Sequence, residues 1–143
     1  MEFPAVTTDR IKQVLHSLEL ISQETNQGLV VLMNNTTFLL SCDQVLLTVQ
    51  AAWKGVSTNP AERADLVAAA AELNQTTLAV RHCVVGTGDK DNPLVVTLTV
   101  ETPIVEGLAD PQLLSALEGS FGTIRRCADR LDQRFPHLVT WNA

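Results

Sequence analysis

Residues 94–135 read LVVTLTVETPIVEGLADPQLLSALEGSFGTIRRCADRLDQRF. The opening is rich in β-branched and apolar residues, which predicts a strand over 94–101. The Asp-Pro pair at 110–111 then supplies a helix cap followed by a first-turn proline. The helix is expected to run to about Arg134, because Pro136 disfavours its continuation. This stretch therefore predicts a strand that leads into one long helix.

The long helix carries a regular apolar pattern with alternating spacings of four and three residues. Such a seam is typical of a helix face that packs on a partner, although an amphipathic helix usually covers the sheet of its own domain. Both interpretations stay open. The candidate interaction residues from this seam are Leu117, Phe121, Ile124 and Leu131.

The two tryptophans are further candidates, because exposed tryptophan is a common anchor in protein interfaces. Trp53 follows an alternating strand, where core packing is the favoured interpretation and a half-exposed position near the strand end is the alternative. Trp141 lies in the C-terminal tail and is expected to dock. Trp53 therefore joins the seam as a weaker interaction candidate.

The rest of the chain supplies the other elements of the fold. Thr7 or Thr8 can cap a first helix whose apolar stripe continues to Ile21, with Gly28 as its end. Strands are predicted over 29–33, 36–42, 45–54 and 76–85. A second helix starts with a capping arrangement of Asn59, Pro60 and Glu62 and ends near Leu73. The order helix, three strands, helix, two strands, helix predicts an α+β domain with an antiparallel sheet flanked by helices.

Composition limits the function classes. The chain has 143 residues, fitting one domain over 1–143 with an ordered core of about 8–136. Its formal net charge is −6 and its basic residues are scattered, which argues against nucleic-acid binding. It carries no signal-peptide pattern or long apolar run, so we expect a cytoplasmic protein without membrane contact.

Catalytic and metal-binding patterns are not apparent. His16 falls off the apolar stripe of the first helix and is expected to be solvated, whereas His137 lies in the short tail. His82 and Cys83 are neighbours on a strand, so their side chains point to opposite faces. We therefore predict no catalytic residues, no metal and no cofactor. A ligand or metal site using His82 or Cys42 remains the alternative.

Several stretches together resemble the YbjN-domain family in its actinobacterial form, and through it the type III secretion chaperone-like fold. They are Ala71-Glu72-Leu73-Asn74, the strand opening at 92–100, the run at 107–113 and the end of the last helix at 132–136. The resemblance implies a domain that is often dimeric and is described as chaperone-like or as a regulator of sensory transduction. It implies no enzyme activity and no ligand.

The sequence thus leads to one main expectation. We predict a non-enzymatic, cytoplasmic protein-binding module. We expect it to bind a protein partner and to form a homodimer. A small-ligand or metal-binding regulatory domain is the second hypothesis, and an enzyme is the third.

Overall fold

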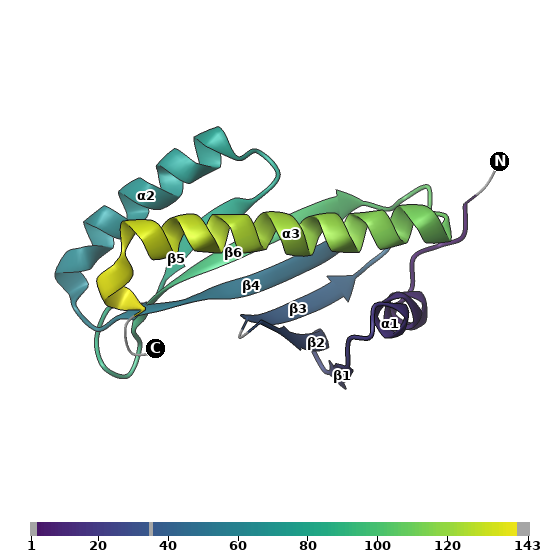
Figure 1. Cartoon of the computed structure of the whole chain (residues 1–143), viewed down its shortest axis with the longest axis horizontal. Coiled ribbons are helices and arrows are strands. Elements are labelled where there is room, and N and C mark those ends of the chain that lie inside the picture. Colours follow the sequence, from purple (N-terminus) through teal and green to yellow (C-terminus); the bar gives the residue numbers. More distant parts are fainter. Residues whose placement is uncertain (1–2, 35, 140–143) are drawn as a thin grey trace. The chain divides into compact units, whose positions relative to one another are not determined.

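The computed structural model describes residues 3–34 and 36–139. Its six strands form one antiparallel sheet in the order β1-β2-β3-β4-β6-β5 (Figure 1). The α+β class and the order of the predicted elements are confirmed, with β1 as an additional strand. The elements are α1 (Thr8–Ser17), β1 (Ser22–Thr25), β2 (Gly28–Met33), β3 (Thr36–Cys42), β4 (Leu46–Ser57), the 3-10 turn η1 (Pro60–Glu62), α2 (Arg63–Thr76), β5 (Arg81–Val85), β6 (Leu94–Pro103), α3 (Asp110–Arg134) and the 3-10 turn η2 (Pro136–Leu138).

The chain forms two compact units. Unit 1 comprises residues 1–51 and 100–122, and unit 2 comprises residues 52–99 and 123–143. Helix α3 and strands β4 and β6 each contribute residues to both units. Within the described residues, no helix has the length and apolar character needed to cross a membrane.

In unit 1, the helices α1 and α3 pack on one face of the sheet. Strand residues on this face alternate with exposed ones, as the two-residue period of a strand requires. Phe38 of β3 meets Phe121 of α3 edge to face, with ring centroids 4.9 Å apart. On the same side, Lys12 of α1 bonds Glu24 of β1. The buried residues of this core include Ile11, Leu15, Leu29, Val31, Phe38, Leu40, Leu47, Val49, Leu113, Leu117 and Phe121.

The first helix is shorter than predicted. It begins at the expected cap, since the Thr7 hydroxyl accepts a hydrogen bond from the Arg10 amide. It ends at Ser17, and Glu19 adopts a left-handed φ of 60° while the Leu20 amide bonds back to the Leu15 carbonyl. This is the geometry of a helix end that glycine usually supplies. Because no glycine marks it, the sequence pattern was wrongly extended to Gly28, and strand β1 was missed.

The buried residues of unit 2 include Leu66, Ala69, Ala70 and Leu73 of α2, His82 of β5, Leu94, Val96 and Leu98 of β6, and Ile124, Cys127 and Leu131 of α3. Trp53 of β4 is also buried, as the core-packing interpretation predicted. Its indole Nε1 donates to Asp132 of α3 at 2.7 Å, and its ring lies 6.3 Å from that of Phe135. A buried indole needs such an acceptor, which explains the tryptophan at this position.

The start of α2 differs in detail from the predicted capping box. Asn59 caps η1, because its side chain accepts from the Ala61 amide, and α2 itself begins only at Arg63. The Glu62 carboxylate bonds other groups instead of the helix backbone. The helix also extends to Thr76, so that β5 begins at Arg81 and the strand predicted over 76–85 loses its first half.

Candidate interaction sites

The structure places the predicted interaction residues in the interior. Their side chains are between 0 and 6 % exposed, so little of their surface is open to a partner. For the four residues of α3, this burial agrees with the other interpretation, in which the stripe covers the sheet of its own domain. These buried residues are Leu117, Phe121, Ile124, Leu131 and Trp53. Trp141, which was expected to dock, lies outside the described residues.

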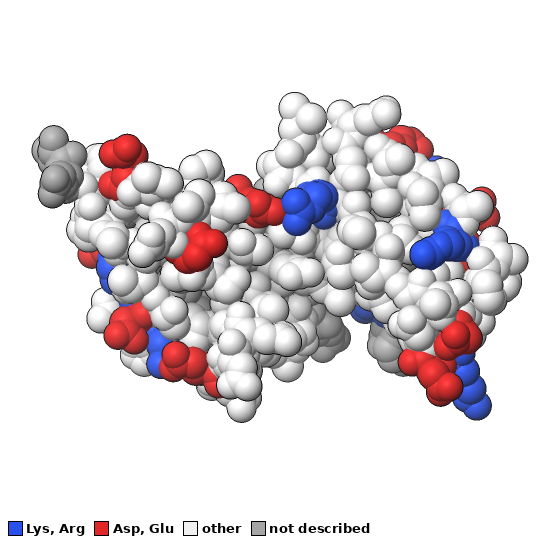
Figure 2. Space-filling view, turned by 180° about the vertical axis from the view of Figure 1, so that it is seen from behind, with Lys and Arg blue, Asp and Glu red and all other residues white. Residues whose placement is uncertain are grey.

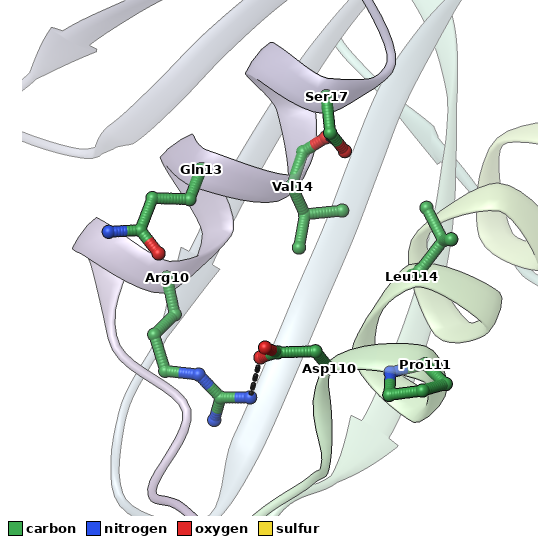
Figure 3. Close-up of a pocket in the computed structure, with 7 residues that line it drawn as sticks. All are labelled: Arg10, Gln13, Val14, Ser17, Asp110, Pro111 and Leu114. Carbon is green, nitrogen blue, oxygen red and sulfur yellow. Dashed lines mark hydrogen bonds and ion pairs between the residues drawn. The ribbon is translucent and has the colours of Figure 1, made fainter.

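A hollow of about 390 Å³ lies between α1 and the first turns of α3 in unit 1. Figure 3 shows Val14 of α1 and Leu114 of α3 projecting into the space between the two helices. Arg10 and Asp110 close one side with an ion pair of 2.8 Å. Gln13, Ser17 and Pro111 complete the lining. The hollow therefore offers apolar surface beside a few polar groups.

A second hollow, of about 250 Å³, is lined by residues that come later in the chain than those of the first hollow at both helices. Leu18 and Leu20 line it from the end of α1 and the next turn, and Met33 lines it from β2. Glu118 and Phe121 line it from α3. We call the two hollows together the α1–α3 groove. Its lining is mainly aliphatic, with Glu118 as the one charged residue of the second hollow.

Among the described residues of unit 1, both helices lie on the same face of the sheet, and the other face is open. Along β1 to β4, the residues on this open face are uncharged: Gln23, Thr25, Val30, Leu32, Thr37, Leu39, Ser41, Leu46, Thr48 and Gln50. Leu32 is 68 % exposed, and Ile21, next in register beyond the Ser22–Val31 pair, is 92 % exposed. Figure 2 views the chain from this side and shows charged groups spaced over a mostly uncharged surface.

A hydroxyl, a carboxylate and an imidazole meet in unit 2. The buried Ser57 hydroxyl donates to Glu62 at 2.8 Å, and Glu62 also bonds the His137 Nε2 at 2.7 Å. The hydrogen bond from His137 lowers the pKa of Glu62. Serine hydrolases place the imidazole between the hydroxyl and the carboxylate, so that it can take the hydroxyl proton. Here the carboxylate is in the middle, and the cluster instead ties η2 to η1.

His82 is a buried residue of β5 that contacts Asn74 of α2. Asn74 Oδ1 accepts from the His82 backbone amide at 2.6 Å and lies 2.9 Å from Nδ1, while Asn74 Nδ2 donates to the His82 carbonyl at 3.0 Å. Burial lowers the pKa of His82, and the nearby Arg130 charge acts in the same direction. The ring is therefore neutral near pH 7, and its buried Nε2 has no hydrogen-bond partner among the residues that the structure describes.

The cysteines do not join His82 in a site. The half-buried Cys42 points its thiol toward the Val6 carbonyl in unit 1. Cys83 is exposed on β5, and burial raises the pKa of Cys127 on α3. Among the residues that the structure describes, no group of three or more His, Cys, Asp or Glu side chains could hold a metal ion.

Sequence reasoning missed the α1–α3 groove entirely. Val14 belongs to the apolar stripe of the first helix, and Leu114 continues the α3 seam three residues before Leu117. Nothing in the sequence around either residue distinguishes it from the buried core residues of its helix. A pattern within one helix could not show that positions 100 residues apart line the same groove.

Comparisons with known proteins agree with the fold. No protein-family model and no curated protein matches the sequence. The crystal structure of YbjN from E. coli, named as a candidate transcription regulator, matches with a TM-score of 0.72 and 18 % identity over 92 % of this chain and 96 % of that one. An uncharacterised protein from Methanothermobacter thermautotrophicus matches with a TM-score of 0.61 and 12 % identity, covering 91 % and 99 %. The chain thus has a YbjN-like α+β fold.

Proposed function

We propose that this protein is a non-enzymatic protein-binding module, chaperone-like or regulatory, whose partner segment lies in the α1–α3 groove. The observation that carries the proposal is the pair of hollows with apolar lining between two helices of unit 1. Grooves of this kind accept side chains of a helical segment at spacings of three and four residues. The regulator named among the similar folds is compatible with such a role.

The absence of enzyme activity is part of this proposal. It is supported by the order of the Ser57, Glu62 and His137 contacts, which leaves the serine without an imidazole base. The described polar residues of the groove are an arginine, a glutamine, a serine and two carboxylates, and the Ser17 hydroxyl bonds the Val14 carbonyl while Arg10 pairs with Asp110. A nucleophile with a base in hydrogen-bond reach is what hydrolytic chemistry would require.

We further propose a cytoplasmic location, a homodimer, no nucleic-acid partner, and membership of the actinobacterial form of the YbjN family. For the homodimer, we propose the open face of unit 1 as the contact in place of the buried α3 seam. The uncharged strand residues support this choice, because no like charges would meet directly across such a contact.

A small-ligand regulator is the alternative function. The first hollow, at about 390 Å³, lies within the roughly 300–1,000 Å³ range of small-molecule sites. Native mass spectrometry of the purified protein distinguishes the two functions. A stoichiometric added mass that disappears with Leu114→Gln would favour the alternative over a protein segment.

The test of protein binding uses three synthetic 18-residue helical peptides with identical leucine positions and with lysine, glutamine or glutamate at the remaining positions. Fluorescence anisotropy measures their affinity for the full chain. We expect at least one peptide to bind, and Val14→Gln or Leu114→Gln to weaken binding about tenfold or more, consistent with the loss of an apolar anchor.

The control is Val67→Gln, which changes an exposed valine of α2 outside the groove. It should bind like the parent chain, and circular dichroism should show that all three variants are folded. If no peptide binds, or if Val67→Gln weakens binding as much as Leu114→Gln, the proposed function is wrong.

A further inference from the structure

Acidic residues are distributed very unequally between the two units. Unit 1 contains two basic and nine acidic residues, a formal charge of −7, whereas unit 2 contains eight basic and seven acidic residues, a formal charge of +1. The excess negative charge of the chain therefore belongs to the unit that holds the α1–α3 groove. A field of one sign over a surface selects and steers partners of the opposite sign.

Both basic side chains of unit 1 are already engaged. Arg10 donates to Asp110 and to the carbonyl oxygens of Pro4, Ala5 and Leu108. Lys12 forms an ion pair of 2.9 Å with Glu24, which raises the pKa of the lysine. These cations are thus committed to contacts within the unit, and they contribute little attraction toward an acidic partner.

Carboxylates remain available along the groove. Asp110 is 86 % exposed although it pairs with Arg10, whose own side chain is only 16 % exposed. Glu118 is exposed at the second hollow. A ligand in the groove would therefore meet aliphatic lining from Val14, Leu18 and Leu114 beside negative charge.

We infer that the groove recognises a basic amphipathic segment of a partner protein, with aliphatic anchors facing the hollows and lysine or arginine facing the carboxylates. This inference rests on the proposed protein-binding function and adds the chemistry of the partner. Apolar anchors supply affinity, whereas complementary charges supply selectivity and a faster, salt-dependent association.

The same three peptides test the charge of the partner. We expect the lysine peptide to bind about tenfold tighter than the glutamine peptide in 50 mM salt, and the glutamate peptide to bind most weakly. The preference should shrink to about threefold or less in 500 mM salt, because exposed charges are screened over a few ångströms at that ionic strength.

Matched charge variants locate the attraction. Glu118→Gln should weaken lysine-peptide binding about threefold and leave glutamine-peptide binding unchanged. Glu106→Gln makes the same charge change at an exposed residue of unit 1 that lines neither hollow, and it should have a smaller effect. If both variants weaken binding equally, the attraction is not specific to the groove and the inference is wrong.

The remaining outcomes separate this inference from the proposed function. If the glutamine or glutamate peptide binds as well as the lysine peptide and Leu114→Gln still abolishes binding, the protein-binding function stands and the basic partner is wrong. If no peptide binds at either salt concentration, both are wrong.

Discussion

The Trp53 ring occupies the space that a side chain at position 55 would need, which explains the glycine there. A Cβ atom at Gly55 would overlap the Trp53 ring, whereas a Cβ at Gly119 in α3 would meet no atom within 4 Å. We therefore predict that Gly55→Ala destabilises the fold by about 1–3 kcal/mol. The matched variant Gly119→Ala should stabilise it by about 0.5–1 kcal/mol, because alanine is the better helix former. Urea unfolding measures both, and equal effects would contradict the packing around Trp53.

His82 makes stability depend on pH. The pKa of His82 is lowered in the folded state, so the unfolded chain binds a proton more readily. Stability should therefore fall as the pH decreases below about 6.5, at up to about 1.4 kcal/mol per pH unit until the folded-state pKa is reached. We predict that His82→Phe reduces this loss between pH 6.5 and 5.

His16 is exposed on α1, as the sequence predicted. The control for His82 is Val67→Gln, which changes an exposed valine of α2 and should follow the parent chain over the same pH range. Urea unfolding at a series of pH values provides the measurement. If His82→Phe and the parent chain lose stability in parallel, His82 is not the responsible group.

At the scale of elements, Asn74 of α2 protects the outer edge of β5. Its side chain satisfies both the amide and the carbonyl of His82. Edge strands are sites where foreign strands can pair, and blocking them prevents unwanted association. Addition of a partner strand is therefore opposed at this position of β5.

We predict that Asn74→Ala exposes this edge. The variant should lose about 1–3 kcal/mol of stability, since two buried backbone groups lose their partners. Hydrogen exchange at the His82 amide should accelerate, and amides of Phe38 and Leu40 in unit 1 provide an internal reference. Unchanged exchange at His82 would show that Asn74 does not protect the edge.

The elements differ in how clearly the sequence predicts them. The Asp110-Pro111 start made α3 evident, and Asn34 between β2 and β3 has a positive φ of 51°, which suits a tight turn. The end of α1 could not be predicted, because Glu19 adopts a left-handed conformation without glycine. The α3 stripe was recognised, but whether it covers its own sheet depends on tertiary packing. The groove depends on packing between distant helices and had no local signal.

At the scale of the whole molecule, the open face of unit 1 limits the strength of a homodimer. Four strands about 4.8 Å apart, with about six residues each, present roughly 400 Å². A standard interface buries about 800 Å² per partner. We therefore predict a weak dimer that dissociates on dilution to micromolar concentration.

Sedimentation velocity over a dilution series measures this equilibrium. Leu32→Asp should shift it to the monomer, because a charge would enter the uncharged face. Leu78→Asp changes an exposed leucine in unit 2 and serves as the control. A dimer that survives Leu32→Asp, or is lost with Leu78→Asp, would rule out the open face as its contact.

The central claim is that the α1–α3 groove binds a protein segment. Its most direct test is a titration of the isotope-labelled full chain with the lysine peptide, followed by amide chemical shifts in ¹H–¹⁵N NMR spectra. We predict that the shifted amides gather in Thr8–Ser17, around Met33 and in the first three turns of α3. Shifts that gather in α2 or β5 instead, or no shifts at a saturating peptide concentration, would contradict the account.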